Sequence, residues 1–376
     1  MVLTLMVLTL TVLTGPAVAQ QSAPTPSTVG VQPRASGAVL LYVDDNHTQV
    51  VKTTTAGRVT QGATSVSATV GFDFITAASV DLITAASPRG FEERRTQVDG
   101  AVEQNLGEGT RLNGGYNLSH EPDYLTHALR IGGQTELFAR HLILSGGYGL
   151  SLSEVGRRND SVFSEQRQGH TFSLSATRIV TRMLAVDVSY SLALVRGFQS
   201  NAYRYVRLFG PDTASSQHIT SVAEHTPNTR ARHALVGRLR WRMLHAIFLH
   251  ASYRGYVDTW GMTAHTGTVR ALWSPGGGVF SLALRGRGHS QGPVDFYRAR
   301  YDTFPDVPTL RTADKELGPM WTALVGAHLE WSPRLTWVDA LHVGAGADWL
   351  HIRYLDYAYL SRRNALLVTL DLTLEL

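Results

Sequence analysis

Strict alternation of apolar and polar side chains recurs along this chain and constrains its fold more than any other feature. In the segment 184–194 the even positions are Leu, Val, Val, Tyr, Leu and Leu, whereas Asp187, Ser189 and Ser191 stand between them. The segments 142–153 and 366–376 alternate in the same way. Successive side chains of a β-strand point to opposite faces, so the pattern predicts strands with one apolar and one polar face.

The length of these segments separates two kinds of β-protein. A soluble sheet on a core and a barrel with an apolar outside and a wet lumen both produce alternation. The alternating segments run to about ten residues or more, the length at which a tilted strand crosses a bilayer. Tight connections such as 138–141 and 242–245 also alternate with long ones at 76–90, 155–168, 199–230 and 289–318. We therefore predict an all-β fold, a transmembrane antiparallel β-barrel with short periplasmic turns and long extracellular loops.

Sixteen segments qualify as strands of this barrel. They are 36–44, 47–58, 63–75, 92–105, 110–120, 125–138, 142–154, 169–180, 183–197, 230–242, 245–258, 263–273, 279–289, 319–331, 338–353 and 363–376. The count falls to 14 if the first two are not strands, and either even number brings both ends of the barrel to one side. Trp241, Trp273 and Trp331 adjoin short turns, as an aromatic girdle at the periplasmic interface requires.

The N-terminus has the pattern of a cleaved secretory signal. An apolar run from Val2 to Leu13 is followed by Gly15-Pro16 and then by Ala17-Val18-Ala19, a small-x-small cleavage pattern. We expect a signal peptide at 1–19, a flexible periplasmic lead-in at 20–35 and the barrel at 36–376. The run is too short for a membrane anchor, which needs roughly 20 apolar residues. These segments predict export to the outer membrane.

Composition excludes several other classes of protein. The net charge of +4 is too small to suggest a nucleic-acid partner, and the chain has no cysteine for a disulfide or a thiolate metal site. Glycine is abundant, at 35 residues, and only 17% of the residues are charged. We expect no cofactor and no nucleic-acid partner, and the general partners of such a barrel are outer-membrane lipid and the barrel-assembly machinery.

One motif occurs twice in succession, as Asp-Phe-Ile-Thr-Ala-Ala-Ser and Asp-Leu-Ile-Thr-Ala-Ala-Ser, between residues 73 and 87. Alternation turns the first aspartate into the lumen near the extracellular rim, and the rest leaves the membrane. Three interpretations stay open: a structural brace for the loop, a substrate-facing selectivity element, or a cation site. The residues of this loop motif, together with a later acidic pair, are Asp73, Thr76, Ser79, Asp81, Thr84, Ser87, Glu121 and Asp123.

These motifs resemble a family of Gram-negative outer-membrane proteins known only as a domain of unknown function. The shared features are Tyr42 with Asp44 and Asp45, the paired motif, Glu92 or Glu93 with Arg94 or Arg95, and Ser119, Glu121, Asp123 and Tyr124. The resemblance covers the N-terminal third well and the remainder in its barrel pattern. It implies an outer-membrane barrel without assigned activity, and points weakly to periplasmic thioredoxin-like and flavin-transferring neighbours.

Strand parity predicts a positive wall inside the barrel. The inward arginines on four consecutive strands are Arg238, Arg240, Arg242, Arg254, Arg270, Arg285 and Arg287. The acids expected elsewhere in the lumen are Asp73, Asp99, Glu103, Glu136, Asp187, Glu330, Asp348, Asp371 and Glu375. Opposed rows of charge favour a porin-like pore for small polar or anionic solutes, or an export step. The alternatives are a non-conducting structural barrel, in which the charges pair and plug the lumen, and an outer-leaflet hydrolase.

Enzymatic motifs give little support to a hydrolase. His120-Glu121 lacks a second histidine at the zinc-binding spacing, and Pro122 excludes the helix that such a motif needs. A loop cluster of His120, Glu121, Asp123 and His127 remains conceivable, but there is no Gly-x-Ser-x-Gly elbow and no phosphate-binding loop. We therefore expect a protein that is not an enzyme.

Overall fold

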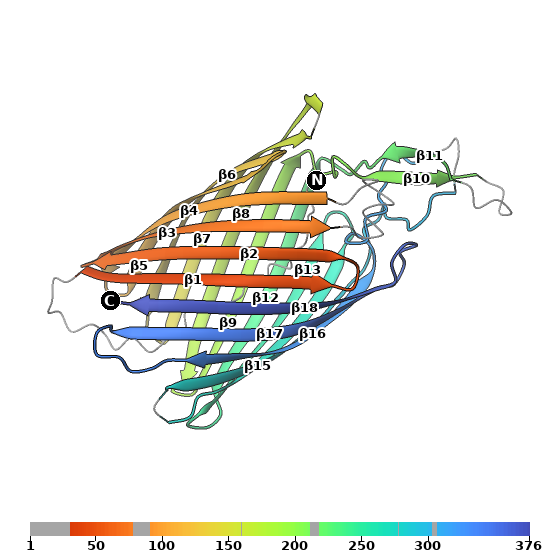
Figure 1. The fold of residues 1–376 in the computed structure, drawn as a ribbon. Helices are drawn as coiled ribbons and strands as arrows, with labels where there is room; N and C mark the ends of the chain where they lie inside the picture. Colours follow the sequence, from red (N-terminus) through yellow and green to blue (C-terminus); the bar gives the residue numbers. More distant parts are fainter. Residues whose placement is uncertain (1–30, 78–90, 159, 211–217, 277, 303–306) are drawn as a thin grey trace.

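The computed structural model describes residues 31–77, 91–158, 160–210, 218–276, 278–302 and 307–376. Sixteen antiparallel strands form one closed barrel, and a separate two-stranded sheet lies outside it (Figure 1). The barrel strands are β1 (Val31–Asp44), β2 (Thr48–Gln61), β3 (Thr64–Ala77), β4 (Phe91–Gly107), β5 (Thr110–Glu121), β6 (Tyr124–Leu137), β7 (Leu142–Arg157), β8 (Asp160–Thr181), β9 (Leu184–Gly197), β12 (Thr229–Arg242), β13 (Ile247–Asp258), β14 (Thr263–Trp273), β15 (Phe280–Gln291), β16 (Met320–Trp331), β17 (Ala340–Tyr354) and β18 (Arg362–Glu375).

Each barrel strand pairs with the next one along the chain, and β1 closes the cylinder against β18. The prediction of a sixteen-stranded antiparallel barrel is confirmed, and the alternative count of 14 is wrong. In the described part of the chain, no helix is both long and apolar enough to span a bilayer. The predicted signal peptide lies in residues 1–30, outside the described residues, and β1 begins inside the segment expected to be a flexible lead-in.

The register of the strands fixes the tilt and width of the barrel. Tyr116 on β5 is opposite Leu129, which is opposite Leu150 on β7, two residues above Tyr148. A step back of two residues, from Leu150 to Tyr148, leads to the directly opposed residues of the next hairpin. With the same two-residue step at each of the eight hairpins, this path around the barrel returns to Tyr116. The shear number is therefore 16, equal to the number of strands. Strand spacing and rise then give a tilt of about 35° and a backbone radius of roughly 15 Å.

The two ends of the barrel differ in their connections. At the turn end, where β1 begins and β18 ends, the connections are the short segments 62–63, 108–109, 138–141, 182–183, 243–246, 274–279 and 332–339. The loop end carries the two longest connections, 198–228 and 292–319. The first contains β10 (Tyr205–Phe209) and β11 (His218–Ala223), the small sheet that extends beyond the loop end in Figure 1.

One predicted loop is wrong. Residues 155–168 were expected to form a long connection, but β7 runs to Arg157 and β8 starts at Asp160. The two strands continue pairing past the barrel rim, with Val155 opposite Glu165 and Gly156 opposite Ser164. The sequence pattern did not reveal this extension because polar residues occur on both of its faces. Alternation of apolar and polar residues is lost where a hairpin extends beyond the lipid.

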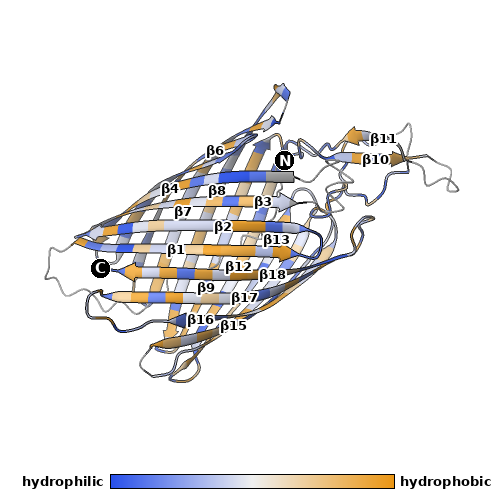
Figure 2. Cartoon of the chain, viewed as in Figure 1, coloured by the Kyte–Doolittle hydropathy of each residue, from blue (hydrophilic) through white to orange (hydrophobic). Residues whose placement is uncertain are grey.

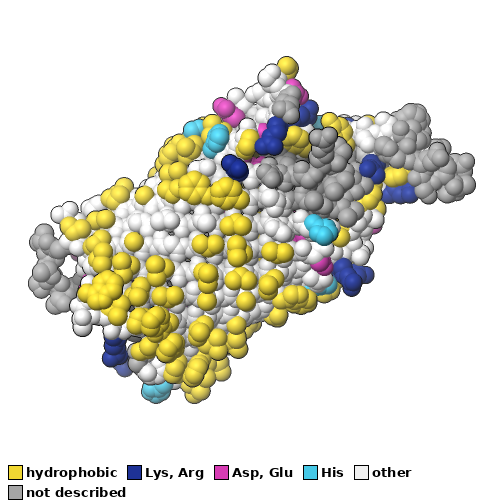
Figure 3. All heavy atoms as spheres, viewed as in Figure 1, with side chains coloured by type: hydrophobic (Ala, Val, Ile, Leu, Met, Phe, Trp, Pro, Cys, Tyr) yellow, Lys and Arg dark blue, Asp and Glu magenta, His cyan; other side chains and the backbone are white. Residues whose placement is uncertain are grey.

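Alternation sorts the side chains as the sequence predicts. Large apolar residues lie exposed on the outer wall, and apolar and polar positions alternate along the strands (Figures 2 and 3). On β12, Leu235 is 56% exposed and Trp241 is 41% exposed, whereas Ala234 between outward neighbours is 5% exposed. A closed barrel satisfies every backbone hydrogen bond between strands, which is the condition for placing such a surface in lipid.

Two tight connections at the loop end share one construction. Asp44 and Asp258 both end a Tyr-Val-Asp sequence at the end of a strand. One carboxylate oxygen of Asp258 accepts from the amides of Trp260 and Met262, at 2.9 and 3.1 Å, and the same oxygen of Asp44 accepts from Asn46 and Thr48, both at 2.9 Å.

The other carboxylate oxygen binds a tyrosine and an arginine in both turns. For Asp258 these are Tyr256, two residues earlier, and Arg230 on the preceding strand β12; for Asp44 they are Tyr42 and Arg363 on β18. The carboxylates of both aspartates are fully buried. In each turn the residue three positions after the aspartate has a positive φ, 59° at His47 and 85° at Gly261. A buried ion pair thus holds each of these turns closed.

We predict that Asp258→Ala destabilises the folded barrel by about 3–5 kcal/mol, because it leaves the Arg230 guanidinium buried without its partner. Equilibrium urea unfolding in lipid vesicles, followed by tryptophan fluorescence, measures the change. Asp302→Ala is the matched control, since the Arg300–Asp302 pair is exposed, and exposed pairs contribute about 0–1 kcal/mol. Equal effects of the two substitutions would contradict the role assigned to the buried carboxylate.

Candidate functional site in the barrel lumen

The seven predicted arginines lie on the inner faces of β12 to β15. On β12, Arg238 and Arg240 alternate with the outward residues Leu235 and Trp241, which are exposed, and Leu239, which is half-buried. Arg254 follows the exposed Tyr253 on β13, and Arg285 follows the exposed Leu284 on β15. The strands thus bring residues from four different segments of the sequence onto one patch of the interior, which we call the arginine wall.

Strand register aligns part of the arginine wall into a row across the barrel. Arg240 is directly opposite His250, which is opposite Arg270, which is opposite Arg285. Directly opposed Cβ atoms on neighbouring strands lie about 4.5–5.5 Å apart, a spacing at which like charges destabilise a sheet. The row therefore concentrates positive charge at one level of the lumen.

Two of the seven arginines have acidic partners. Arg238 binds Asp187 and also donates to Ser189, at 3.0 Å. Arg285 makes a two-point contact with Asp348, two strands away on β17, by reaching across Gly326. A Cβ atom at Gly326 would overlap the Asp348 carboxylate, so only glycine leaves room for this pair.

The other five arginines have no acidic partner in the part of the chain that the structure describes. No carboxylate of the described residues lies within 4.0 Å of Arg240, Arg242, Arg254, Arg270 or Arg287. Arg232, which is also on the inner face of β12 and was not among the predicted lumen residues, likewise has no carboxylate of the described residues within 4.0 Å. The Nε atoms of Arg232 and Arg287 are buried without an acceptor among the residues that the structure describes. The wall therefore carries positive charge that no ion pair within the described ranges neutralises.

The acidic residues predicted for the remainder of the lumen are, by contrast, all paired. Each of the nine has a basic side chain within 4.0 Å. The pairs are Asp73 with Lys52 and Arg95, Asp99 with Arg130, Glu103 with Arg58, Glu136 with Arg140, Asp187 with Arg238, Glu330 with His342, Asp348 with Arg285, Asp371 with His328, and Glu375 with Arg34. Seven of these acids are thus neutralised by an arginine or a lysine, whereas Glu330 and Asp371 have a histidine partner, which neutralises them only when it is protonated.

The described part of the loop motif makes the contacts of a brace. Asp73 on β3 lies 3.6 Å from Lys52 on β2 and 4.0 Å from Arg95 on β4, so it links three strands. Thr76 is near the end of β3, opposite Glu92. Ser79, Asp81, Thr84 and Ser87 lie outside the described residues, so the second copy of the motif stays a prediction.

Glu121 and Asp123 belong to an acidic cluster that the sequence analysis found only in part. One carboxylate oxygen from each of Glu93, Glu121 and Asp123 lies within 4.8 Å of the others. Arg95 lies 3.6 Å from Glu121, and the Tyr203 hydroxyl donates to Asp123. These contacts suit an ionic network at the barrel rim as well as a cation site. Glu93 was recognisable only as one of two adjacent glutamates.

The long loops form a layer at the loop end. Tyr301 and Thr312, at 1% and 0% exposure, are buried in it, and Thr312 binds Glu224 from the other long loop. Arg204 pairs with Asp314. Burial, the largest cause, and the hydrogen bond to Asp123 raise the pKa of Tyr203 to about 12, so this hydroxyl keeps its proton near neutral pH.

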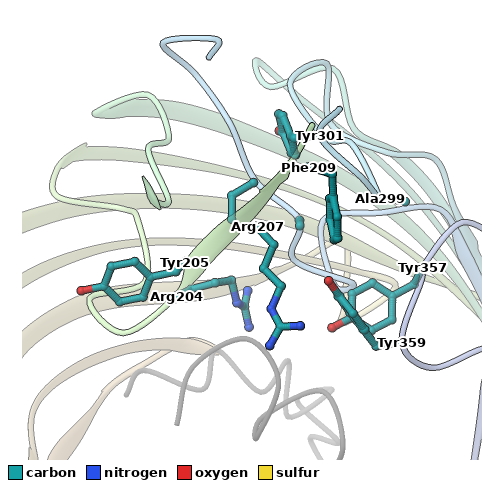
Figure 4. Close-up of a pocket in the computed structure, with 10 residues that line it drawn as sticks. Arg204, Tyr205, Arg207, Phe209, Ala299, Tyr301, Tyr357 and Tyr359 are labelled. Carbon is teal, nitrogen blue, oxygen red and sulfur yellow. The ribbon is translucent and has the colours of Figure 1, made fainter. Parts of the chain in front are cut away.

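The layer also turns inward and holds an aromatic pocket. Lys315 lies 5.8 Å from the ring centroid of Tyr354, on the inner face of β17, so the connection 292–319 reaches into the mouth of the barrel. Three loops line the pocket (Figure 4). Its residues are Arg204, Tyr205, Val206, Arg207, Phe209, Ala299, Tyr301, Ala313, Tyr357 and Tyr359. Arg207 lies over the Tyr359 ring, 5.6 Å from its centroid.

Two arrangements of described residues could suggest an enzyme, and neither has the required geometry. Ser332 and Glu330 both approach the same nitrogen of His342, Nδ1, at 2.8 and 3.5 Å. A catalytic triad needs the serine and the acid on different ring nitrogens. The loop cluster considered in the sequence does not assemble either, because His127 binds Tyr116 on the outer wall while Glu121 lies beside Arg95.

Solved structures with a similar fold are membrane barrels. A bacterial polysaccharide outer membrane secretin superposes with a TM-score of 0.50 at 12% identity, over 93% of this chain and 99% of that one. OprD from Pseudomonas aeruginosa gives a TM-score of 0.45 at 8% identity, over 92% and 94%. OccK2 (OpdF) from the same organism, in complex with glucuronate, gives 0.45 at 9%, over 92% and 98%. At these identities the likeness establishes the fold alone.

The sequence itself matches one family model. No curated protein matches it. The family model covers residues 153–344, more than half of the chain, and this range includes the whole arginine wall. The match lies outside the N-terminal motifs on which the resemblance rested, so the paired motif is not part of it. On this match, the chain belongs to the family described as Protein of unknown function (DUF3570).

Proposed function

We propose that this protein is an outer-membrane barrel through which small polar or anionic solutes pass, as a porin-like pore or as the outer-membrane step of an export route. The observation that carries the proposal is the difference between paired acids and unpaired arginines in the lumen. Surplus positive charge along a water-filled path raises the local concentration of anions and lowers that of cations. A radius of roughly 15 Å leaves room for water inside the inward side chains.

The inward course of connection 292–319 supports a narrowed path rather than a wide one. Its contact with Tyr354 places Lys315 at the mouth, above the arginine wall. Solutes entering from the loop end meet the layer formed by the two long loops before they reach the arginines. We propose that this layer sets the size of the solute and that the arginine wall sets its charge.

Location and processing belong to the same proposal. The lipid-facing surface and the fold support insertion into the outer membrane by the barrel-assembly machinery, after removal of a signal peptide at 1–19. Periplasmic thioredoxin-like or flavin-transferring proteins are proposed partners only through the family resemblance. We propose no enzymatic activity. The competing functions are a non-conducting structural barrel and an outer-leaflet hydrolase, and a conductance measurement separates the pore from both.

We predict that the refolded protein forms anion-selective channels in planar bilayers and that Arg240→Glu lowers the anion-to-cation permeability ratio at least about twofold, because it reverses one charge in the central row. The reversal potential in a KCl gradient measures this ratio. Arg94→Glu is the matched control: it makes the same charge change on the outer wall, beside the exposed Phe74. A silent bilayer with folded, heat-modifiable protein would exclude the open pore.

Selectivity should also depend steeply on salt in the unaltered protein. The Debye length falls from about 10 Å at 0.1 M salt to about 3 Å at 1 M. Anion preference should therefore be strong in a gradient centred on 0.1 M KCl and nearly absent in one centred on 1 M. Selectivity that persists unchanged at 1 M would indicate a binding site in contact with the ion instead of the field of the wall.

The loop layer gives a third test. Tyr301→Ala removes a fully buried ring and should loosen the layer by about 3–5 kcal/mol. We expect larger or noisier conductance steps in single-channel records and faster proteolysis of the loops. Tyr301→Phe keeps the ring and should leave the step size close to that of the unaltered protein. Identical records for the alanine variant would show that the layer does not restrict the path.

A further inference from the structure

Four hairpins carry the same tyrosine–histidine pair on the outer wall. In each pair the tyrosine hydroxyl and the histidine Nδ1 lie 2.6–2.8 Å apart. The ring centroids are 6.0–6.2 Å apart in all four pairs. The pairs are Tyr116 with His127, Tyr148 with His170, Tyr190 with His233, and Tyr253 with His265.

The four pairs lie at one level of the barrel. Each histidine is two residues above the residue directly opposite its tyrosine, in all four hairpins. From one pair to the next, the tyrosine lies two residues closer to the turn end than the residue aligned with the previous tyrosine. With a shear number of 16, this offset keeps all four tyrosines at the same height along the barrel axis. The pairs therefore form a half-ring, the tyrosine–histidine belt, from β5 to β14.

The depth of the belt matches an interface of the membrane. His233 and His265 lie eight residues above Trp241 and Trp273, the tryptophans at the turn end. Eight residues along a strand tilted by about 35° span about 22 Å, against an outward apolar band of about 25 Å in such barrels. Tryptophan marks one edge of the apolar band, and the belt lies close to the other.

Each pair leaves a hydrogen-bond donor on the lipid side. If the tyrosine donates to Nδ1, the proton of the neutral ring is on Nε2; if Nδ1 donates, the tyrosine O–H has to find another acceptor. Neither group has a second hydrogen bond within the described residues. An unsatisfied donor in hydrocarbon costs several kcal/mol, so the belt needs acceptor oxygens from its surroundings.

We propose that the tyrosine–histidine belt is a binding surface for phosphate-bearing lipid, with a headgroup phosphate accepting a hydrogen bond at each pair. The proposal rests on the outer-membrane location proposed above. The belt faces lipid and not solution, because exposed apolar residues lie above it, Leu152 and Val257, as well as below it. The four hairpins of the remaining half have no such pair at this level. The residues at the corresponding positions are Gly286 and Ala323, Ala347 and Leu366, Val39 and Val51, and Val70 and Thr96. Phosphate lipids would accordingly be ordered on one side only.

The test counts phosphatidylglycerol molecules bound to the full barrel in neutral detergent micelles, by native mass spectrometry. We expect up to four tightly bound lipids, and a weakening of about tenfold in the variant H127F/H170F/H233F/H265F, the effect of losing one hydrogen bond to a charged group. The matched control V39F/V51F places phenylalanine at the same level where no pair exists and should bind like the unaltered protein. If the fourfold variant does not fold, H265F alone should lose one of the four lipids.

Two further binding measurements test whether the bound phosphate belongs to a lipid headgroup. Diacylglycerol, which has the same chains and no phosphate, should bind at least about tenfold more weakly than phosphatidylglycerol. Water-soluble glycerol phosphate, which can reach the arginine wall, should not displace the lipid. Equal binding by the fourfold variant, equal binding of diacylglycerol, or displacement by glycerol phosphate would each overturn the proposal. Channel selectivity is measured separately, so failure here leaves the pore proposal intact.

Discussion

Backbone hydrogen bonding is the constraint on which the remainder of this structure depends. In hydrocarbon every amide and carbonyl needs a partner within the protein. Sixteen strands meet this requirement only when β1 joins β18, and that closure dictates the alternation of side chains, the tilt and the lumen. The apolar outer wall and the charged interior are two faces of the same strands. Substitutions that shift the register of one strand would therefore exchange lipid-facing and lumen-facing residues together.

Inside the barrel, some charged side chains are neutralised by ion pairs and others are not. The ion pair of Asp73 ties neighbouring strands together, and those of Asp99 and Asp348 each reach across one intervening strand on the inner surface. On β12 to β15, by contrast, arginines oppose one another and a histidine. Repulsion within this row opposes folding, and neutral side chains at these positions would avoid it. The stability cost of this row supports the proposed passage of anionic solutes over a purely structural role.

The sequence predicted the elements of this fold well because lipid enforces alternation over long segments. Alternation, segment length and the positions of the turns together located all sixteen barrel strands, and parity gave the inward side of Arg240 and Arg285. Alternation fails where the chain leaves the lipid, so the β7–β8 extension and the small sheet of β10 and β11 were missed. Parity gives the face of a residue but not its height. The alignment of Arg240, His250 and Arg270 depends on registers between strands, which turn lengths alone do not determine. The repeated Tyr-Val-Asp sequence was a readable signal for the two matching turns.

The equality of shear number and strand number has a consequence for these two turns. When the two values agree, one hairpin maps onto the next by a rotation of about 45° about the barrel axis, without translation along it. Val39 on β1 and Tyr253 on β13 are at the same height, and Tyr42 and Tyr256 lie three residues above them. On the preceding strands, Val368 and Leu235 are also at equivalent positions, and Arg363 and Arg230 lie five residues above them. The two turns are thus copies at equivalent positions of a wall with pseudo-eightfold symmetry. A turn from one of these positions should fit structurally at the other, with its arginine already in place.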